Sequence, residues 1–103
     1  YLFPFQMIPK GSRIALYGGG QVGKVFFRQI EKSRYCDLVV WVDRKAKEAE
    51  GRRLHAPADT DWSVCDYVVI AIEAEERAET IKKELHQKYG ISRDKLIWHD
   101  PLM

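Results

Sequence analysis

The stretch Arg13-Ile-Ala-Leu-Tyr-Gly-Gly-Gly-Gln-Val-Gly-Lys24 decides how this chain of 103 residues is expected to fold. Its first part, residues 13–17, has the apolar composition of a buried β-strand. Residues 21–32 carry apolar side chains at the three- and four-residue steps of a helix. These side chains are Val22, Val25, Phe26 and Ile30. The stretch therefore predicts a strand, a glycine turn and a helix in succession, with Phe27 off the apolar face and partly exposed.

The glycines of this turn, Gly18, Gly20 and Gly23, have the spacing G-x-G-x-x-G. A second apolar run, residues 38–42, ends at Asp43, 20 residues after Gly23. Strand, glycine turn, helix, second strand and acid in this order form the dinucleotide-binding fingerprint. In this interpretation the first glycine allows the tight turn, the second lets a pyrophosphate approach the backbone, and the third lets the helix pack closely on the sheet.

The residues around the turn predict how such a ligand would be held. The helix N-terminus would offer free N–H groups and a positive dipole end to the phosphates. Asp43 would accept hydrogen bonds from a ribose hydroxyl and repel a 2′-phosphate, which predicts NAD in preference to NADP. Arg44 would swing toward a 2′-phosphate, stack on adenine or stay in solvent. The predicted cofactor-binding residues are Gly18, Gly20, Gln21, Val22, Gly23, Asp43 and Arg44.

Two other interpretations of the glycine turn were weighed against this one. Gly18-x-x-x-x-Gly23-Lys24 is the front of a Walker A loop, but Val25 stands where a Ser or Thr would hold Mg²⁺, which disfavours an NTPase. The other interpretation stays open: a glycine turn that only joins a strand to a helix, with Asp43 solvated at a strand end.

The rest of the chain continues the alternation of strands and helices. We expect a short third strand over 51–56, a helical turn over 59–64 capped by Asp59 or Thr60, a strand over 67–72, a helix over 75–89 ended by Gly90, and a last strand over 95–99. This alternation predicts an α/β fold with a Rossmann-like parallel sheet of about five strands, in the order 3-2-1-4-5, with helices on both faces. The ligand crevice would lie at the carboxyl ends of the first and fourth strands.

Residues 1–12 are expected to be an irregular lead-in, because two prolines and a glycine interrupt them. Phe3, Phe5 and Ile8 in this segment would pack on the sheet or on a neighbouring domain. Residues 13–103 have the length of one small domain with one core. Because the chain starts with Tyr and not Met, we expect it to be part of a longer protein.

Composition excludes several classes of function. A net charge of +2 gives no argument for nucleic acid or membrane binding, and no apolar run approaches the roughly 20 residues that span a bilayer. The two cysteines and three histidines show neither a disulfide framework nor metal-ligand spacing, so we expect no metal and a reducing, cytoplasmic location. No catalytic residues are predicted, and Glu73, Glu75 and Glu76 would repel a second anionic group on the far side of the crevice.

Several motifs resemble those of a bacterial Rossmann-type module. They are Phe3-Pro-Phe5, Ile8-Pro-Lys-Gly-Ser-Arg-Ile14, Leu16-Tyr-Gly-Gly-Gly-Gln-Val-Gly23, Trp41-Val-Asp43, Cys65-Asp-Tyr-Val-Val-Ile-Ala-Ile72, Gly90-Ile91 and Lys95-Leu-Ile-Trp98. Such modules are appended to glycosyltransferases and methyltransferases of cell-surface polysaccharide synthesis, and are similar to the NAD(P)- or CoA-binding-like domains of nucleotide-sugar enzymes. A frequent form of the motif has Ala where this chain has Gly19, and because Gly is sterically permissive, this departure from the family pattern is expected to cost little.

The resemblance implies an accessory domain that binds NAD or a related nucleotide (NADP, CoA or a nucleotide sugar) inside a larger sugar-modifying protein. The other domains of that protein would be its partners, and a homo-oligomer stays open. Two alternatives also stay open. One is a structural or assembly domain with a vestigial site. The other is the cofactor half of an oxidoreductase or epimerase whose catalytic part lies elsewhere in the parent chain.

Overall fold

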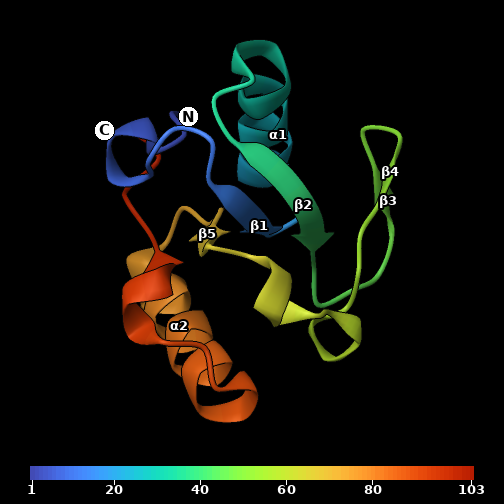
Figure 1. Ribbon diagram of the computed structural model, residues 1–103, viewed down its shortest axis with the longest axis vertical. Coiled ribbons are helices and arrows are strands. Elements are labelled where there is room, and N and C mark those ends of the chain that lie inside the picture. The colour runs from blue at the N-terminus through green and yellow to red at the C-terminus, as the bar shows by residue number, and fades with distance from the viewer.

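In the computed structural model, which describes residues 1–103, a parallel four-stranded sheet lies between two helices (Figure 1). The strands of this sheet are β1 (Arg13–Tyr17), β2 (Asp37–Val42), β5 (Tyr67–Ile70) and β6 (Leu96–Ile97), in the order β2-β1-β5-β6. The helices are α1 (Gln21–Ser33) and α2 (Glu75–Tyr89). Four 3₁₀ turns complete the chain, at Phe5–Met7, Pro57–Asp59, Trp62–Val64 and Arg93–Lys95. Neither helix combines the length and apolar character that crossing a membrane requires.

The predicted third strand is absent from the sheet, so the five-strand order 3-2-1-4-5 is wrong. Residues of that region pair instead with the segment just before them, as the two-residue strands β3 (Glu48–Ala49) and β4 (Arg52–Arg53). Glu50 and Gly51 between them both have positive φ, 51° and 73°, as a tight hairpin turn requires. Only His55 still pairs in parallel with the end of β2, at Val42. The local hairpin thus uses the backbone groups that a fifth strand would have offered.

The other elements follow the sequence closely. The first strand, both helices and the left-handed Gly90 that ends α2, at φ 69°, are as predicted. The predicted strands 67–72 and 95–99 are shorter, because only four and two of their residues make sheet pairs. The helical turn expected over 59–64 is a pair of 3₁₀ turns, and the second is capped by Asp61 and not by Asp59 or Thr60.

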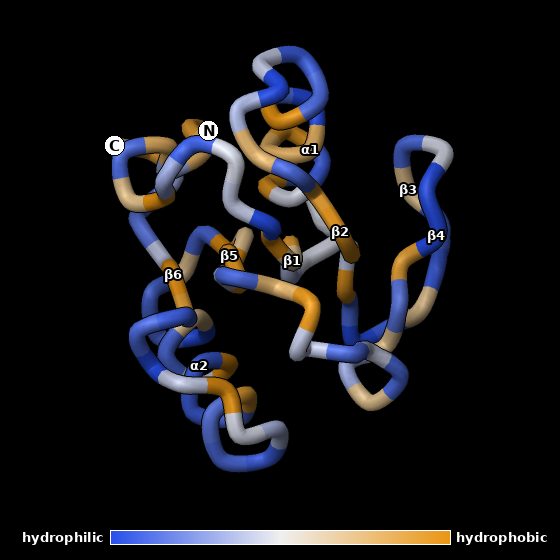
Figure 2. The backbone as a smooth tube through the Cα atoms, in the orientation of Figure 1, coloured by the Kyte–Doolittle hydropathy of each residue, from blue (hydrophilic) through white to orange (hydrophobic).

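The core consists of one apolar cluster on each side of the sheet. Alternate residues of β1 point to opposite faces: Ile14 and Leu16 belong to the cluster under α1, Ala15 and Tyr17 to the cluster under α2. Figure 2 shows hydrophobic stretches along β2 and β6, the two outer strands of the sheet. The two helices therefore cover opposite faces of the sheet, as the sequence predicted.

Phe27 is buried, and the prediction of partial exposure is wrong. Its ring stacks on Trp41 of β2, with centroids 4.9 Å apart and an interplanar angle of 13°. The guanidinium of Arg52 in β4 lies over the ring, 5.7 Å from its centroid. The hairpin that replaces the third strand thus covers a side of α1 that helical periodicity alone would leave open.

Residues 1–12 pack against the α1 side of the molecule. Phe3 and Ile8 are almost completely buried in that cluster, with Phe5 partly buried against it. The backbone N–H of Phe3 donates to Oε1 of Gln29 in α1 at 2.8 Å, and the N–H of Leu2 donates to the carbonyl of Pro101 at 2.8 Å. The lead-in is therefore fastened to the first helix and to the end of the chain.

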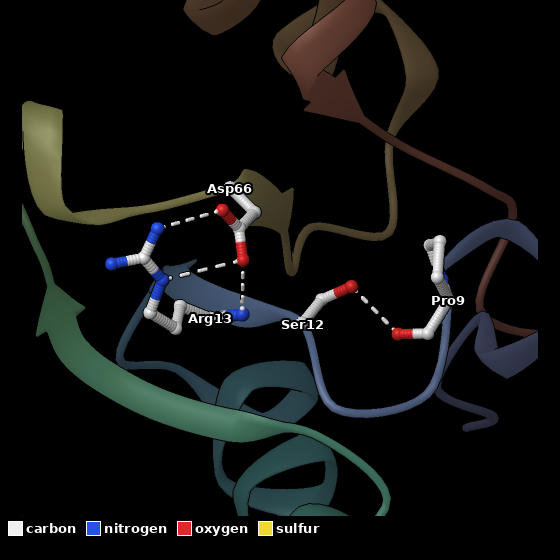
Figure 3. Close-up of polar contacts among 4 residues, drawn as sticks. All are labelled: Pro9, Ser12, Arg13 and Asp66. Atoms are coloured by element: carbon white, nitrogen blue, oxygen red, sulfur yellow. Dashed lines mark hydrogen bonds and ion pairs between the residues drawn. The ribbon is translucent and has the colours of Figure 1, made fainter.

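Asp66 precedes β5 and binds the first residue of β1, at the end of the strands opposite the glycine turn. Its carboxylate accepts the backbone N–H of Arg13 at 2.7 Å and pairs with the guanidinium at 3.1 Å, while the hydroxyl of the neighbouring Ser12 donates to the carbonyl of Pro9 (Figure 3). The hydrogen bonds from Arg13 lower the pKa of Asp66 below its usual value.

This contact predicts a specific acid sensitivity. A carboxylate whose pKa is lowered on folding stabilises the folded state above its unfolded pKa of about 4, and that contribution is lost as pH falls through the lowered value. We expect Asp66→Asn to be less stable than the wild type at neutral pH and to lose less stability between about pH 4 and pH 2. Urea unfolding at several pH values measures this. Asp59→Asn, at an exposed carboxylate, is the control. Parallel pH profiles for the wild type and Asp66→Asn would contradict the prediction.

Candidate functional site

The glycine turn connects the end of β1 to the start of α1 and requires glycine at two positions. Gly18 has φ +123°, and a Cβ there would lie 2.8 Å from the carbonyl oxygen of Ala71. A Cβ on Gly23 would overlap the Gly18 carbonyl group, far inside the 3.0 Å below which Cβ atoms are essentially never found. The first glycine of the motif therefore lets the turn pass close to Ala71, and the third lets α1 pack closely on the turn.

Gly20 differs from the other two, because a Cβ there would meet no atom within 4 Å. It is the residue that caps α1, and no side chain hydrogen-bonds to the first turn of that helix. The backbone N–H groups at the start of the helix are thus left to solvent or to a ligand. No packing contact within the chain therefore requires glycine at position 20.

Trp41 and Val42 at the end of β2, together with Asp43 directly after it, hold the glycine turn in place. The indole N–H of Trp41 donates to the carbonyl of Gly18 at 2.7 Å, and the N–H of Gly18 donates to the carbonyl of Val42 at 2.8 Å. One oxygen of Asp43 accepts the N–H of Gly19 at 2.6 Å, and its other oxygen accepts the N–H of Lys45 at 2.8 Å. Asp43 therefore orders the turn as well as facing the cleft.

Gly19, between the first two glycines of the motif, is also closely packed. A Cβ at this position would collide with Cδ2 of Leu54, a fully buried side chain, and would also come within 3.0 Å of Asp43 Oδ2. An Ala at position 19, frequent in the modules that the chain resembles, would therefore require Leu54 to shift, because the segment after the hairpin packs directly on the turn.

A cleft of about 550 Å³ lies over the turn, within the size range of small-molecule sites. It is formed where β1 and β5 end, next to the starts of both helices. The predicted cofactor-binding residues that line it are Gly18, Gly20, Gln21, Val22, Asp43 and Arg44. Gly23 does not line the cleft and lies behind the turn, where it makes room for Gly18.

The far side of the cleft differs from the purely acidic surface expected from the sequence. Of the three carboxylates considered there, only Glu73 lines the cleft. Its Oε2 accepts the hydroxyl proton of Tyr1 at 3.0 Å, so the first residue of the chain forms part of the wall. Arg77 of α2 adds a positive charge to the same wall. One carboxylate and one guanidinium thus face the cleft from α2 and the loop before it.

Three basic residues of the cleft were missed by the sequence prediction: Lys45, Lys47 and Arg77. The two lysines follow Asp43 in a segment for which no function was predicted, and Arg77 lies in the first turn of α2 beside Glu75 and Glu76. Their proximity to Asp43, two and four residues further along the chain, was the available signal for the lysines.

Neither Tyr17 in the cleft nor the two cysteines buried elsewhere in the chain are activated for covalent chemistry. Burial raises the pKa of Tyr17, at the floor of the cleft, to about 12, so its hydroxyl stays protonated at neutral pH. Both cysteines are free and buried, and burial raises the pKa of the Cys36 thiol to about 11 and also raises that of Cys65. Buried thiols of this kind are poor nucleophiles. No group of three or more His, Cys, Asp or Glu side chains lies close enough to hold a metal ion.

Comparison of the chain with protein-family models, with curated proteins and with solved structures found no significant match. The site is therefore interpreted from its own residues and geometry.

Proposed function

We propose that this protein binds an adenine dinucleotide of the NAD type in the cleft over the glycine turn. The observation that carries the proposal is the contrast among the three motif glycines. Gly18 and Gly23 are required by contacts within the chain, whereas the space beside Gly20 is empty and opens where α1 begins. A diphosphate lying there would accept hydrogen bonds from the free N–H groups of the helix and interact with its positive end.

Asp43 supports the adenosine side of this proposal. Each of its oxygens accepts one backbone hydrogen bond, and a carboxylate offers about four acceptor positions in all. The remaining positions are available to ribose hydroxyls at the edge of the cleft. A 2′-phosphate would meet this negative charge, so NAD is expected to bind more tightly than NADP.

The resemblance to modules of polysaccharide-modifying proteins favours a role as an accessory domain of a larger glycosyltransferase, methyltransferase or nucleotide-sugar enzyme. The far wall carries Glu73, Arg77 and the Glu73–Tyr1 contact but no cysteine, and both thiols of the chain are buried elsewhere with raised pKa values. This arrangement supports a binding role in preference to catalysis within this domain. Domains of the same parent chain would then be its partners, and the cytoplasm its location.

Isothermal titration calorimetry with NAD⁺, NADP⁺, CoA and a nucleotide sugar tests the proposal, with circular dichroism confirming the folded state. We expect NAD⁺ to bind in the micromolar range and more tightly than the other three. Absence of heat for every nucleotide at millimolar concentration would contradict the proposal and favour a structural or assembly domain with a vestigial site. Tighter binding of CoA or of the nucleotide sugar would change the ligand class.

A further inference from the structure

The charge of the cleft differs from that of a neutral dinucleotide pocket. Four cations line it, Arg44, Lys45, Lys47 and Arg77, against the two carboxylates of Asp43 and Glu73. None of these four cations makes an ion pair, whereas Arg13, Arg28, Arg52 and Lys82 elsewhere on the surface each pair with a carboxylate. The cleft therefore has an excess of two unpaired positive charges.

Lys47 lies against the glycine turn. Its Cε is 3.1 Å from the position that a Cβ on Gly19 would occupy, so its aliphatic stem lies against the turn. Its carbonyl accepts the N–H of the buried Leu54 at 2.7 Å, which fixes its backbone next to the hairpin. The hairpin β3–β4 thus places a lysine over the site where the fingerprint predicts phosphate.

We propose that Lys47 is a phosphate-binding residue of this cleft, and that the ligand consequently contains a diphosphate. The ammonium group is one bond beyond Cε, which keeps it near Gly19, and Lys47 and Gly20 line the same cleft. A diphosphate hydrogen-bonded to the start of α1 lies within reach of it, and charge-assisted hydrogen bonds of this type are among the stronger ones. Asp43 lies on the same side of Gly19, where its oxygens accept backbone N–H groups, and it makes no ion pair with Lys47.

This inference rests on the proposed function and adds a residue that the glycine fingerprint does not contain. In the fingerprint the phosphates are held by backbone N–H groups and the helix dipole alone. A lysine in the segment after Asp43 would favour ligands with a negatively charged phosphate group. Ligands that present adenosine without phosphate, such as adenosine itself or S-adenosylmethionine, would gain nothing from it.

The test compares Lys47→Gln with Lys32→Gln, a matched change at an exposed lysine in the last turn of α1. Calorimetry with NAD⁺ at low and at high salt is the measurement, and the thermal unfolding of both variants is recorded. We expect Lys47→Gln to weaken NAD⁺ binding by about tenfold and to reduce its salt dependence, with Lys32→Gln unchanged. Lys47→Arg, which keeps the charge, is expected to retain most of the affinity.

The outcomes separate the two proposals. If the wild type binds NAD⁺ and Lys47→Gln binds it equally well at both salt concentrations, the role of Lys47 is wrong and the proposed function stands. If the folded wild type binds no phosphate-containing nucleotide, both are wrong. If adenosine or S-adenosylmethionine binds as tightly as NAD⁺, the cleft does not select a diphosphate.

Discussion

A Gly23→Ala variant is expected to lose much of its folded stability, with a fall in Tm of more than about 10 °C. The added methyl group would overlap the carbonyl of Gly18, whose carbon would lie 2.8 Å away. That carbonyl cannot turn aside without loss, because it accepts the indole N–H of Trp41 while the N–H of Gly18 bonds to Val42. Helix α1 would have to move off β1, and overpacking against fixed backbone costs about 3 kcal/mol or more.

Differential scanning calorimetry of Gly23→Ala beside Gly20→Ala measures this effect. The two substitutions add the same methyl group three residues apart, but a Cβ on Gly20 meets no atom within 4 Å. Gly20→Ala is therefore expected to unfold close to the wild-type temperature, since only the modest advantage of Gly as a helix cap is lost. Equal unfolding temperatures for the two variants would show that α1 is not packed as closely on the sheet as this argument requires.

A Gly20→Val variant is expected to lose dinucleotide binding, with affinity for NAD⁺ falling by at least about 100-fold, while the fold is kept. The backbone of Gly20 is extended, with φ −83° and ψ −159°, which a β-branched residue adopts readily. Its side chain would occupy the space in which the diphosphate approaches the N-terminus of α1. The loss of affinity therefore comes from exclusion of the ligand and not from strain in the protein.

Calorimetry with NAD⁺ and the thermal unfolding temperature together test this variant. Lys32→Val adds a valine to the same helix at its exposed far end and controls for the effect of the residue type on α1. We expect that control to bind NAD⁺ normally. If Gly20→Val binds as tightly as the wild type, the ligand does not lie over the glycine turn, and the cleft must be used in another way.

Elements determined by local patterns were predicted well from the sequence. The apolar run of β1, the helical spacing of α1 and the left-handed Gly90 after α2 each depend on a few neighbouring residues. The third strand was predicted wrongly because the same residues can pair either with the sheet or in a local hairpin. Short sequence patterns do not distinguish these two structures. Glu50 adopts a positive φ, which is uncommon for Glu, and the resulting hairpin removes residues 48–53 from the sheet.

The residues of the candidate site likewise fall into those that local sequence patterns predict and those that only the packing of the chain brings to the cleft. The glycine motif and Asp43 were found because they are contiguous with the strands that carry them. Lys47 and Arg77 reach the cleft through the hairpin and through α2, and Tyr1 through a contact with Glu73, 72 residues away in the chain. Such long-range placement follows from packing, which no local spacing in the sequence encodes.

The fluorescence of two tryptophans is expected to respond to a ligand in the cleft. The indole of Trp41 donates to the carbonyl of Gly18, and the indole of Trp98 donates to the carbonyl of Ile72 at 2.7 Å; both carbonyls belong to residues that line the cleft. Trp41 also stacks on Phe27, so its surroundings are dry and rigid. A ligand that displaces either wall changes the surroundings of an indole ring, and the protein thus contains an intrinsic fluorophore on each side of its cleft.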